Sequence, residues 1–230
     1  MPSIYIEQFI NVVLPRIGEI VSTLWLKPTI LWAVTPLFIT LLVMQIYFGR
    51  YRTEELGWNT AFGNAISLFW VSANLMRYLS ENYTIQQLVS ESELILKLII
   101  TFTIALWAII LTLFNFAHII QKRISFIISS SRVVITTAII ITIIIIGNVP
   151  LDKITFVASV IIFLITILIL TIIKRAITPS IGAKIGMKLH EKHIEEERKK
   201  KRERIKEKIK AKKEKFREFF KSVYDWFKVD

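Results

Sequence analysis

Five stretches without a charged residue constrain this chain more than any other feature of its sequence. Each stretch holds 19 to 24 residues, and together they lie between Lys27 and Arg50, Glu55 and Arg77, Lys97 and Lys122, Arg132 and Asp152, and Lys153 and Lys174. About 20 apolar residues in a helix cross the roughly 30 Å of hydrocarbon in a bilayer. The pattern therefore predicts an all-α fold, a polytopic helical membrane bundle with about five transmembrane helices. A membrane barrel would show short alternating segments instead.

Composition agrees with this prediction. Of the 230 residues, 53% are hydrophobic, and the mean hydropathy is +0.54. A soluble domain has about 45–50% apolar residues. The chain has no cysteine, which excludes disulfides, thiolate catalysis and thiolate metal sites.

We divide the chain into three parts. Residues 28–175 form the predicted transmembrane bundle, with spans at about 28–48, 57–78, 95–116, 133–149 and 154–173. Residues 1–27 form an N-terminal segment in which apolar residues recur every three or four positions over 4–26, while Glu7 and Glu19 lie off that face. We interpret it as an amphipathic helix lying at the membrane interface. A sixth span or a re-entrant segment is the alternative.

The distribution of charge predicts the orientation. The connections at 49–56 and 117–132 are basic, whereas 80–94 contains three glutamates and no Lys or Arg. From Lys174 onward there are 20 Lys and Arg against 10 Asp and Glu, so this part supplies +10 of the net charge of +12. Because basic segments stay in the cytoplasm, we expect a multi-pass protein of the plasma membrane with its N-terminus outside and its C-terminus inside.

The span at 57–78 contains the stretch "GWNTAFGNAISLFW" and is unusually polar. At 100° per residue, its polar side chains fall within a sector of about 140°; they are Asn59, Thr60, Asn64, Ser67, Asn74 and Arg77. Small residues at 61, 65 and 72 form a line on roughly the opposite side, which favours close helix packing. The span at 95–116 offers a compatible polar surface with Thr101, Thr112 and Asn115. By contrast, the run "IIITIIII" at 139–146 is expected to face lipid.

This polar face has two interpretations. In the first, span 57–78 is the central helix of the bundle, and its amides and hydroxyls form hydrogen bonds with neighbouring helices, each contributing about 0.6 kcal/mol. In the second, the face lines a path for a solute, a lipid headgroup or a hydrophobic peptide. Arg77 then contacts the solute or headgroup, or extends to the outer interface.

The basic cytoplasmic tail covers residues 176–230. Its segment 190–215 is almost wholly charged and pairs Glu with Lys four residues apart, which stabilises a solvated helix; a weak coiled-coil stalk or disorder is the alternative. An amphipathic helix is predicted at 216–228. Its apolar face and flanking cations are Phe216, Phe219, Phe220, Val223, Trp226, Phe227, Lys215, Arg217 and Lys221. We expect this face to bind anionic lipid headgroups, a cytoplasmic protein partner, or the bundle itself.

The chain lacks the motifs of common enzymes. It contains no HExxH, GxSxG or Walker sequence and no pair of intramembrane aspartates. His193 and Glu197 are four residues apart, but they lie among solvated charges, so we expect no metal site and no cofactor. All eight acidic residues before the tail lie outside the predicted spans, which argues against transport coupled to buried carboxylates.

Three functions remain. The first is a non-enzymatic scaffold or assembly protein in the bilayer, whose tail engages anionic lipid or a protein partner. The second is a small channel or transporter, as a homo-oligomer, with span 57–78 lining its path. The third is an insertase-like biogenesis helper with a ribosome-facing tail. Nucleic acid is a lesser alternative, because the tail interleaves Glu with its Lys and Arg.

Overall fold

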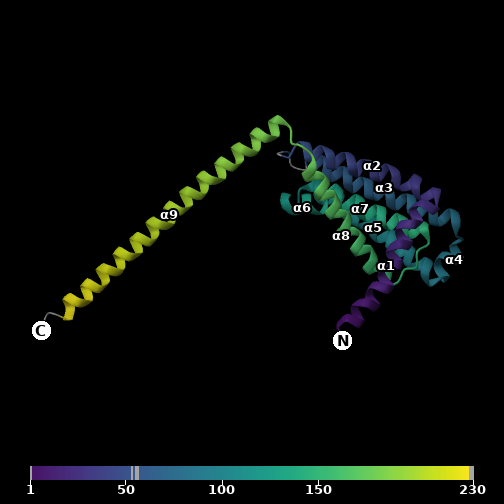
Figure 1. Ribbon diagram of the computed structural model, residues 1–230, viewed down its shortest axis with the longest axis horizontal. Helices are drawn as coiled ribbons and strands as arrows, with labels where there is room; N and C mark the ends of the chain where they lie inside the picture. The colour runs from purple at the N-terminus through teal and green to yellow at the C-terminus, as the bar shows by residue number, and fades with distance from the viewer. Residues whose placement is uncertain (1, 53, 55–56, 228–230) are drawn as a thin grey trace. The chain divides into compact units, whose positions relative to one another are not determined.

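The computed structural model describes the backbone of residues 2–52, 54 and 57–227, and their side chains except those of 2–8, 204, 208, 210–212 and 214–227. Within this part the chain is all-helical and has no strand, which confirms that the fold is all-α. The helices are α1 (Pro2–Leu26), α2 (Pro28–Arg50), α3 (Trp58–Asn82), α4 (Ile85–Ser90), α5 (Ser92–Ala117), α6 (Lys122–Ile128), α7 (Ser131–Gly147), α8 (Lys153–Ala176) and α9 (Ile181–Phe227) (Figure 1).

Local sequence sets the helix ends. Pro28 begins α2, where its missing N–H is no loss. The side chains of Ser130 and Asp152 accept hydrogen bonds from the first turns of α7 and α8. His118 and Asn148 end α5 and α7 in the left-handed conformation, with φ of 55° in each case.

The centre of the bundle is α7, and not α3 as the first interpretation of the polar span expected. Helices α2, α3 and α8 pack against α7, and α5 packs against α3. Eleven of the 17 residues of α7 are buried, among them Ile143 and Ile145. The prediction that the run at 139–146 faces lipid is therefore wrong. A helix that is apolar on all sides is suited to the centre of a bundle as well as to lipid.

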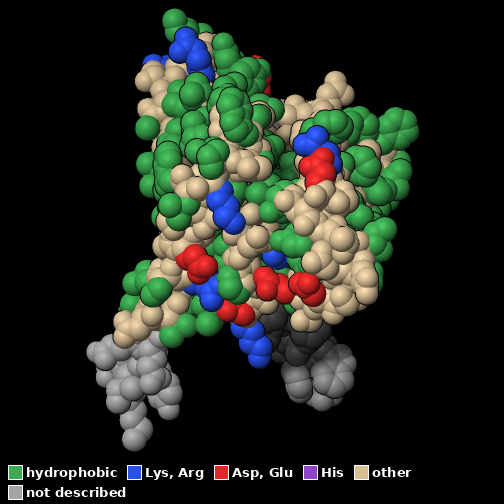
Figure 2. Space-filling view, turned by 90° about the vertical axis from the view of Figure 1, so that its right-hand side faces the viewer, with side chains coloured by type: hydrophobic (Ala, Val, Ile, Leu, Met, Phe, Trp, Pro, Cys, Tyr) green, Lys and Arg blue, Asp and Glu red, His purple; other side chains and the backbone are tan. Residues whose placement is uncertain are grey.

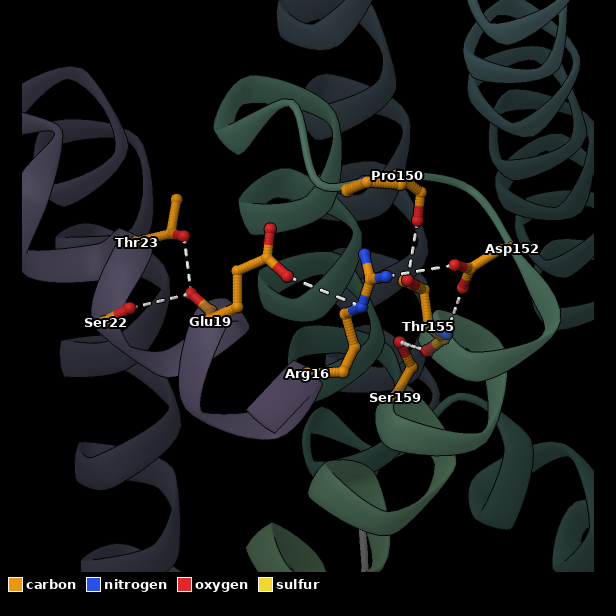
Figure 3. Close-up of polar contacts among 8 residues, drawn as sticks. All are labelled: Arg16, Glu19, Ser22, Thr23, Pro150, Asp152, Thr155 and Ser159. Carbon is orange, nitrogen blue, oxygen red and sulfur yellow. Dashed lines mark hydrogen bonds and ion pairs between the residues drawn. The ribbon is translucent and has the colours of Figure 1, made fainter. Parts of the chain in front are cut away.

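Helix α1 runs across the direction of the bundle helices (Figure 1). It packs against α8, α7 and α2, and Arg16 and Lys27, the residue that follows the helix, form polar contacts near the connection between α7 and α8. Arg16 Nη2 donates a 3.0 Å hydrogen bond to Asp152 Oδ2, and Lys27 Nζ donates one of 2.8 Å to the Gly147 carbonyl (Figure 3 shows the first). Val13 and Ile20 are buried on the same helix. The middle and the end of α1 thus meet the same end of the bundle.

Five helices in the described part are long and apolar enough to cross a membrane. They are Phe9–Leu26, Pro28–Arg50, Ser92–Ala117, Lys122–Gly147, which covers α6 and α7 together, and Lys153–Ala176. The number agrees with the prediction, but the set differs. Most of α1 qualifies, although it was expected at the interface. Helix α3 does not qualify, although it packs in the bundle, because its polar residues lower its hydropathy.

Large apolar side chains cover much of the surface of the bundle. Trp32 is 82% exposed, and Phe156 and Leu164 on α8 are 71% and 59% exposed. Figure 2 shows one face, where hydrophobic side chains predominate and acidic and basic side chains lie together in a few places. Soluble monomers rarely expose apolar surface on this scale, so the surface is compatible with a transmembrane protein.

The chain divides into two compact units, residues 1–178 and 179–230. The first contains α1 to α8. The second contains α9, a continuous helix of 47 residues. The predicted cytoplasmic position of this helix, and its preference for a free helix over a coiled coil, stay predictions.

Candidate functional site

The predicted polar face of α3 divides between the inside and the outside of the bundle. Asn64 is buried, with 5% of its surface exposed, and Thr60 is half-buried. Asn59, Ser67, Asn74 and Arg77 are exposed. The face therefore contributes to two places, a buried polar cluster and an open groove.

The buried polar cluster joins four helices where α3 and α7 begin and α5 ends. Asn64 Nδ2 donates to the Ser129 carbonyl at 2.8 Å and to Ser131 Oγ at 3.0 Å. Asn115 Nδ2 on α5 donates to Ser129 Oγ at 2.9 Å, and Ser125 Oγ on α6 donates to Asn115 Oδ1 at 2.6 Å. All five side chains are at most 5% exposed.

This cluster is a packing element. Each amide has protein partners for both its donor and its acceptor atoms, so the desolvation of these polar groups is compensated. The cluster fixes the connection between α6 and α7 against α3 and α5. Ser129 and Ser131, which the sequence marks only as part of a helix cap, provide two of its three hydroxyls.

The polar residues predicted on α5 are also engaged. Thr101 is buried and Thr112 half-buried, and their hydroxyls donate to the carbonyls of Lys97 and Ala108, each at 2.8 Å. The small residues Ala61, Ala65 and Ser72 lie on the buried side of α3, which packs against α5 and α7.

The open groove lies between α2 and α3, with α7 as its floor. It has a volume of about 420 Å³. Trp32, Ala33 and Pro36 line it from α2, Trp70, Asn74 and Arg77 from α3, and Thr142 and Ile146 from α7. Trp70 is 68% exposed. The polar side chains of Asn74 and Arg77 are thus exposed in this groove, beside the large apolar side chains of Trp32 and Trp70.

Two of these groups have no partner. Thr142 is 3% exposed, and its hydroxyl makes no hydrogen bond in the described part of the chain. The Asn74 amide likewise has no hydrogen bond to any residue that the structure describes. Arg77 has a weak partner, since its Nε lies 3.8 Å from Glu81 Oε1 and both side chains are largely exposed. Of the two unpartnered groups, the exposed Asn74 amide is open to a further hydrogen bond, whereas the Thr142 hydroxyl is buried.

Cations and tyrosines surround the C-terminal end of α7. Lys27 bonds the Gly147 carbonyl, and the Tyr78 hydroxyl donates to the Ile146 carbonyl at 3.3 Å. Lys97 is only 2% exposed, and its Nζ lies 2.8 Å from Asn148 Oδ1 and 3.5 Å from Glu93 Oε1. Positive charge is favourable at this end of a helix. In the sequence, Lys27 marks only the limit of an uncharged stretch, whereas Lys97 also lies on the polar side of the predicted span 95–116.

Arg132 and Lys174 also mark only the limits of uncharged stretches in the sequence. The structure brings them together at the opposite end of the bundle, where the side chains of both line one small cavity. The sequence did not indicate that the two residues lie close together, because Arg132 is in the first turn of α7 and Lys174 lies near the end of α8.

The tail face predicted for binding, from Lys215 to Phe227, lies outside the side chains that the structure describes, although its backbone continues α9. His193 Nε2 lies 3.7 Å from Glu197 Oε1, and both are exposed. Among the described residues, no three His, Asp or Glu side chains converge on a position for a metal ion.

No family model, no curated protein and no solved structure matches this chain.

Proposed function

We propose that this protein is a non-enzymatic integral membrane scaffold that docks a transmembrane helix of a partner in the groove between α2 and α3. The exposed polar edge of α3 carries the proposal. Asn74 and Arg77 lie exposed on an otherwise apolar surface, and polar side chains are costly to leave against lipid. A docked helix would cover them.

The groove has the properties of a helix–helix contact in a membrane. Small residues such as Ala33 and Gly63 line or flank it, and they allow close approach. The exposed Asn74 amide, which has no partner among the described residues, offers hydrogen bonds to a polar side chain on the incoming helix. The partner is therefore expected to carry an Asn, Gln, Ser or Thr within its span.

The orientation belongs to the same proposal. We place the ends of α2 and α8 in the cytoplasm, because Arg50, Arg52 and Arg175 gather there. With α1 lying across the opposite end at the interface and α3 crossing the bilayer, the N-terminus is outside. In the plasma membrane, α9 then extends the basic tail toward anionic lipid or a cytoplasmic protein partner.

The channel is the second candidate, and the exposed residues Asn59, Ser67 and Asn74 favour it over the insertase-like function. However, the buried part of the polar face is closed by the hydrogen bonds of Asn64 and Asn115. A path would have to run along the groove between copies of the chain, and not through one bundle.

A photo-cross-linking amino acid at position 74 tests the docking proposal. In native membranes it should cross-link to a membrane-spanning peptide of one partner or of a second copy, identified by mass spectrometry. The matched control is position 164 on α8, which is exposed on the bundle and does not line the groove. If both positions cross-link only to lipid, the groove is not a docking site.

A further inference from the structure

Two adjoining cavities lie at the end of the bundle where α7 begins. The larger, of about 720 Å³, is lined by α6, by the first residues of α7 and by Ile167 of α8. The smaller, of about 140 Å³, is lined by Gln45 and Phe48 of α2 and by Lys174 of α8. Phe126, Ser130 and Arg132 line both cavities, so Arg132 stands at their junction.

The charge around these cavities is strongly positive. Lys122, Arg123 and Arg132 line the larger cavity, and no carboxylate of the described residues does so. Lys174 and Glu54 line the smaller one. Glu54 already accepts a hydrogen bond from the Tyr47 hydroxyl. Among the residues that the structure describes, four cations and one carboxylate line the cavities, and this carboxylate is itself hydrogen-bonded.

The contacts of Arg132 and Lys174 leave their charges in place. Arg132 Nη1 donates to the neutral Thr171 hydroxyl at 3.3 Å, and Lys174 Nζ lies 5.8 Å from the centre of the Phe48 ring. Neither of these two contacts neutralises a cation. Helix α7 also points its N-terminus here without an acidic residue in its first turn, so its dipole adds positive potential.

The walls of the larger cavity are apolar away from the cations. Phe126, Ile127, Val133 and Ile167 provide them, and Ile127 is 60% exposed on the surface of the bundle. A ligand that fits this site has an anionic head and an apolar body. A free phosphate ion uses the cations but leaves the apolar wall uncovered.

We propose that these cavities bind the phosphate-bearing headgroup of an anionic phospholipid, with Arg132 and Arg123 on the phosphate and one acyl chain along Val133 and Ile167. The proposal rests on the membrane location proposed above, and not on helix docking at α3. Basic pockets between transmembrane helices on the cytoplasmic side are suited to such headgroups. The bound lipid would tie α6 and the start of α7 to the inner leaflet.

The test is native mass spectrometry of the full chain in detergent, titrated with phosphatidylglycerol or with phosphatidylcholine. The wild type should retain one phosphatidylglycerol more tightly than phosphatidylcholine. Arg132→Gln and Arg123→Gln should each weaken this retention about fivefold. Arg123 is exposed, so its variant should fold even if Arg132→Gln does not. Arg50→Gln is the matched control, because it removes an exposed charge at the same end that lines neither cavity.

Three results would overturn the proposal. Equal retention of the two lipids by the wild type would exclude headgroup selectivity. An equal loss in Arg50→Gln would show a general charge effect. Displacement of the lipid by excess inorganic phosphate would show a site for the free ion. Extraction of native membranes with alkaline carbonate tests the proposed membrane location separately. A protein that is not integral to the membrane is released by this treatment, whatever lipid it binds, whereas an integral protein stays in the membrane even if the lipid site is absent.

Discussion

Arg16 on α1 and Asp152 at the start of α8 form an ion pair of 3.0 Å between residues 136 positions apart in the chain (Figure 3). Glu19 is the second carboxylate beside Arg16, at 3.4 Å. Asp152 also accepts a 2.7 Å hydrogen bond from the Thr155 backbone N–H as the cap of α8. The Asp152 carboxylate thus binds α1 through Arg16 and also caps the start of α8, so loss of its charge would weaken both contacts.

The Asp152 contact predicts a dependence on pH. The Thr155 backbone N–H, with the Thr155 hydroxyl and Arg16, lowers the pKa of Asp152 despite an opposing effect of burial. Because the pKa is lower in the folded state, the stabilisation is complete above the ordinary carboxyl pKa of about 4 and is lost as the pH falls through the folded value. Asp152→Asn keeps a cap but loses the charge. Thermal unfolding in detergent should show it less stable than the wild type by about 0.2–1 kcal/mol at pH 7, with the difference vanishing in acid. A constant difference at every pH would contradict this assignment.

The buried polar cluster predicts a cost for removing one amide. Asn115→Ala leaves the hydroxyls of Ser125 and Ser129 without their partner, so we expect a loss of about 1–3 kcal/mol in the free energy of unfolding. Asn59→Ala is the matched control, since Asn59 is exposed on α3 and should change stability by less than about 0.5 kcal/mol. Unfolding of both variants in the same detergent gives the comparison. Equal effects would mean that the cluster does not hold the helices together.

Two glycines on neighbouring helices predict opposite effects of the same substitution. At Gly49 on α2, an added Cβ would lie 2.9 Å from Ile177 Cδ1 and 3.0 Å from the Lys174 carbonyl oxygen. The carbonyl belongs to the backbone and cannot move aside easily, so Gly49→Ala should destabilise the bundle by about 1–3 kcal/mol. At Gly63 on α3 nothing lies within 4 Å, and Gly63→Ala should be neutral or stabilise by up to about 1 kcal/mol. Melting temperatures of the two variants in detergent check the prediction. It fails if Gly49→Ala unfolds at the temperature of the wild type.

The polar face of α3 illustrates how far the sequence could lead. The wheel places Asn64 and Asn74 in one sector, but they lie about 80° apart at 100° per residue. One neighbouring helix covers only part of such a sector. Asn64 therefore faces the bundle and Asn74 faces outward. The sequence identifies the residues, whereas the division between inside and outside depends on where α5 and α7 pack.

The position of α7 could not be predicted from its composition. An isoleucine run has no polar side that distinguishes lipid from protein, because both environments are apolar. The neighbours of Ile143 and Ile145 decide the question, and they come from α2, α3 and α8. The cationic cavities were hidden for a related reason. Arg132 and Lys174 are 42 positions apart, and only the packing of α7 on α8 joins them.

Thiol accessibility distinguishes the docking groove from a channel. The chain has no cysteine, so single cysteines at Asn64, Ser67 and Asn74 can be probed with a membrane-impermeant reagent. A path along the groove between copies requires Ser67→Cys and Asn74→Cys to react in native membranes, and a path through one bundle requires Asn64→Cys to react as well. Docking of a helix predicts that Asn64→Cys stays unreactive in both membranes and detergent, because position 64 is buried.

Positions 67 and 74 distinguish docking from a channel more directly than position 64 does. Under docking, Ser67→Cys and Asn74→Cys should be protected in membranes and should react once detergent separates the partner, because both are exposed on the isolated bundle. Ser80→Cys, on an exposed position near the end of α3, is the control that should react throughout, and Leu68→Cys, fully buried, should never react. If positions 64, 67 and 74 are all labelled rapidly in membranes, the result contradicts the scaffold proposal and supports the channel. If positions 67 and 74 are protected in membranes and become reactive in detergent, a docked helix covers this edge of α3.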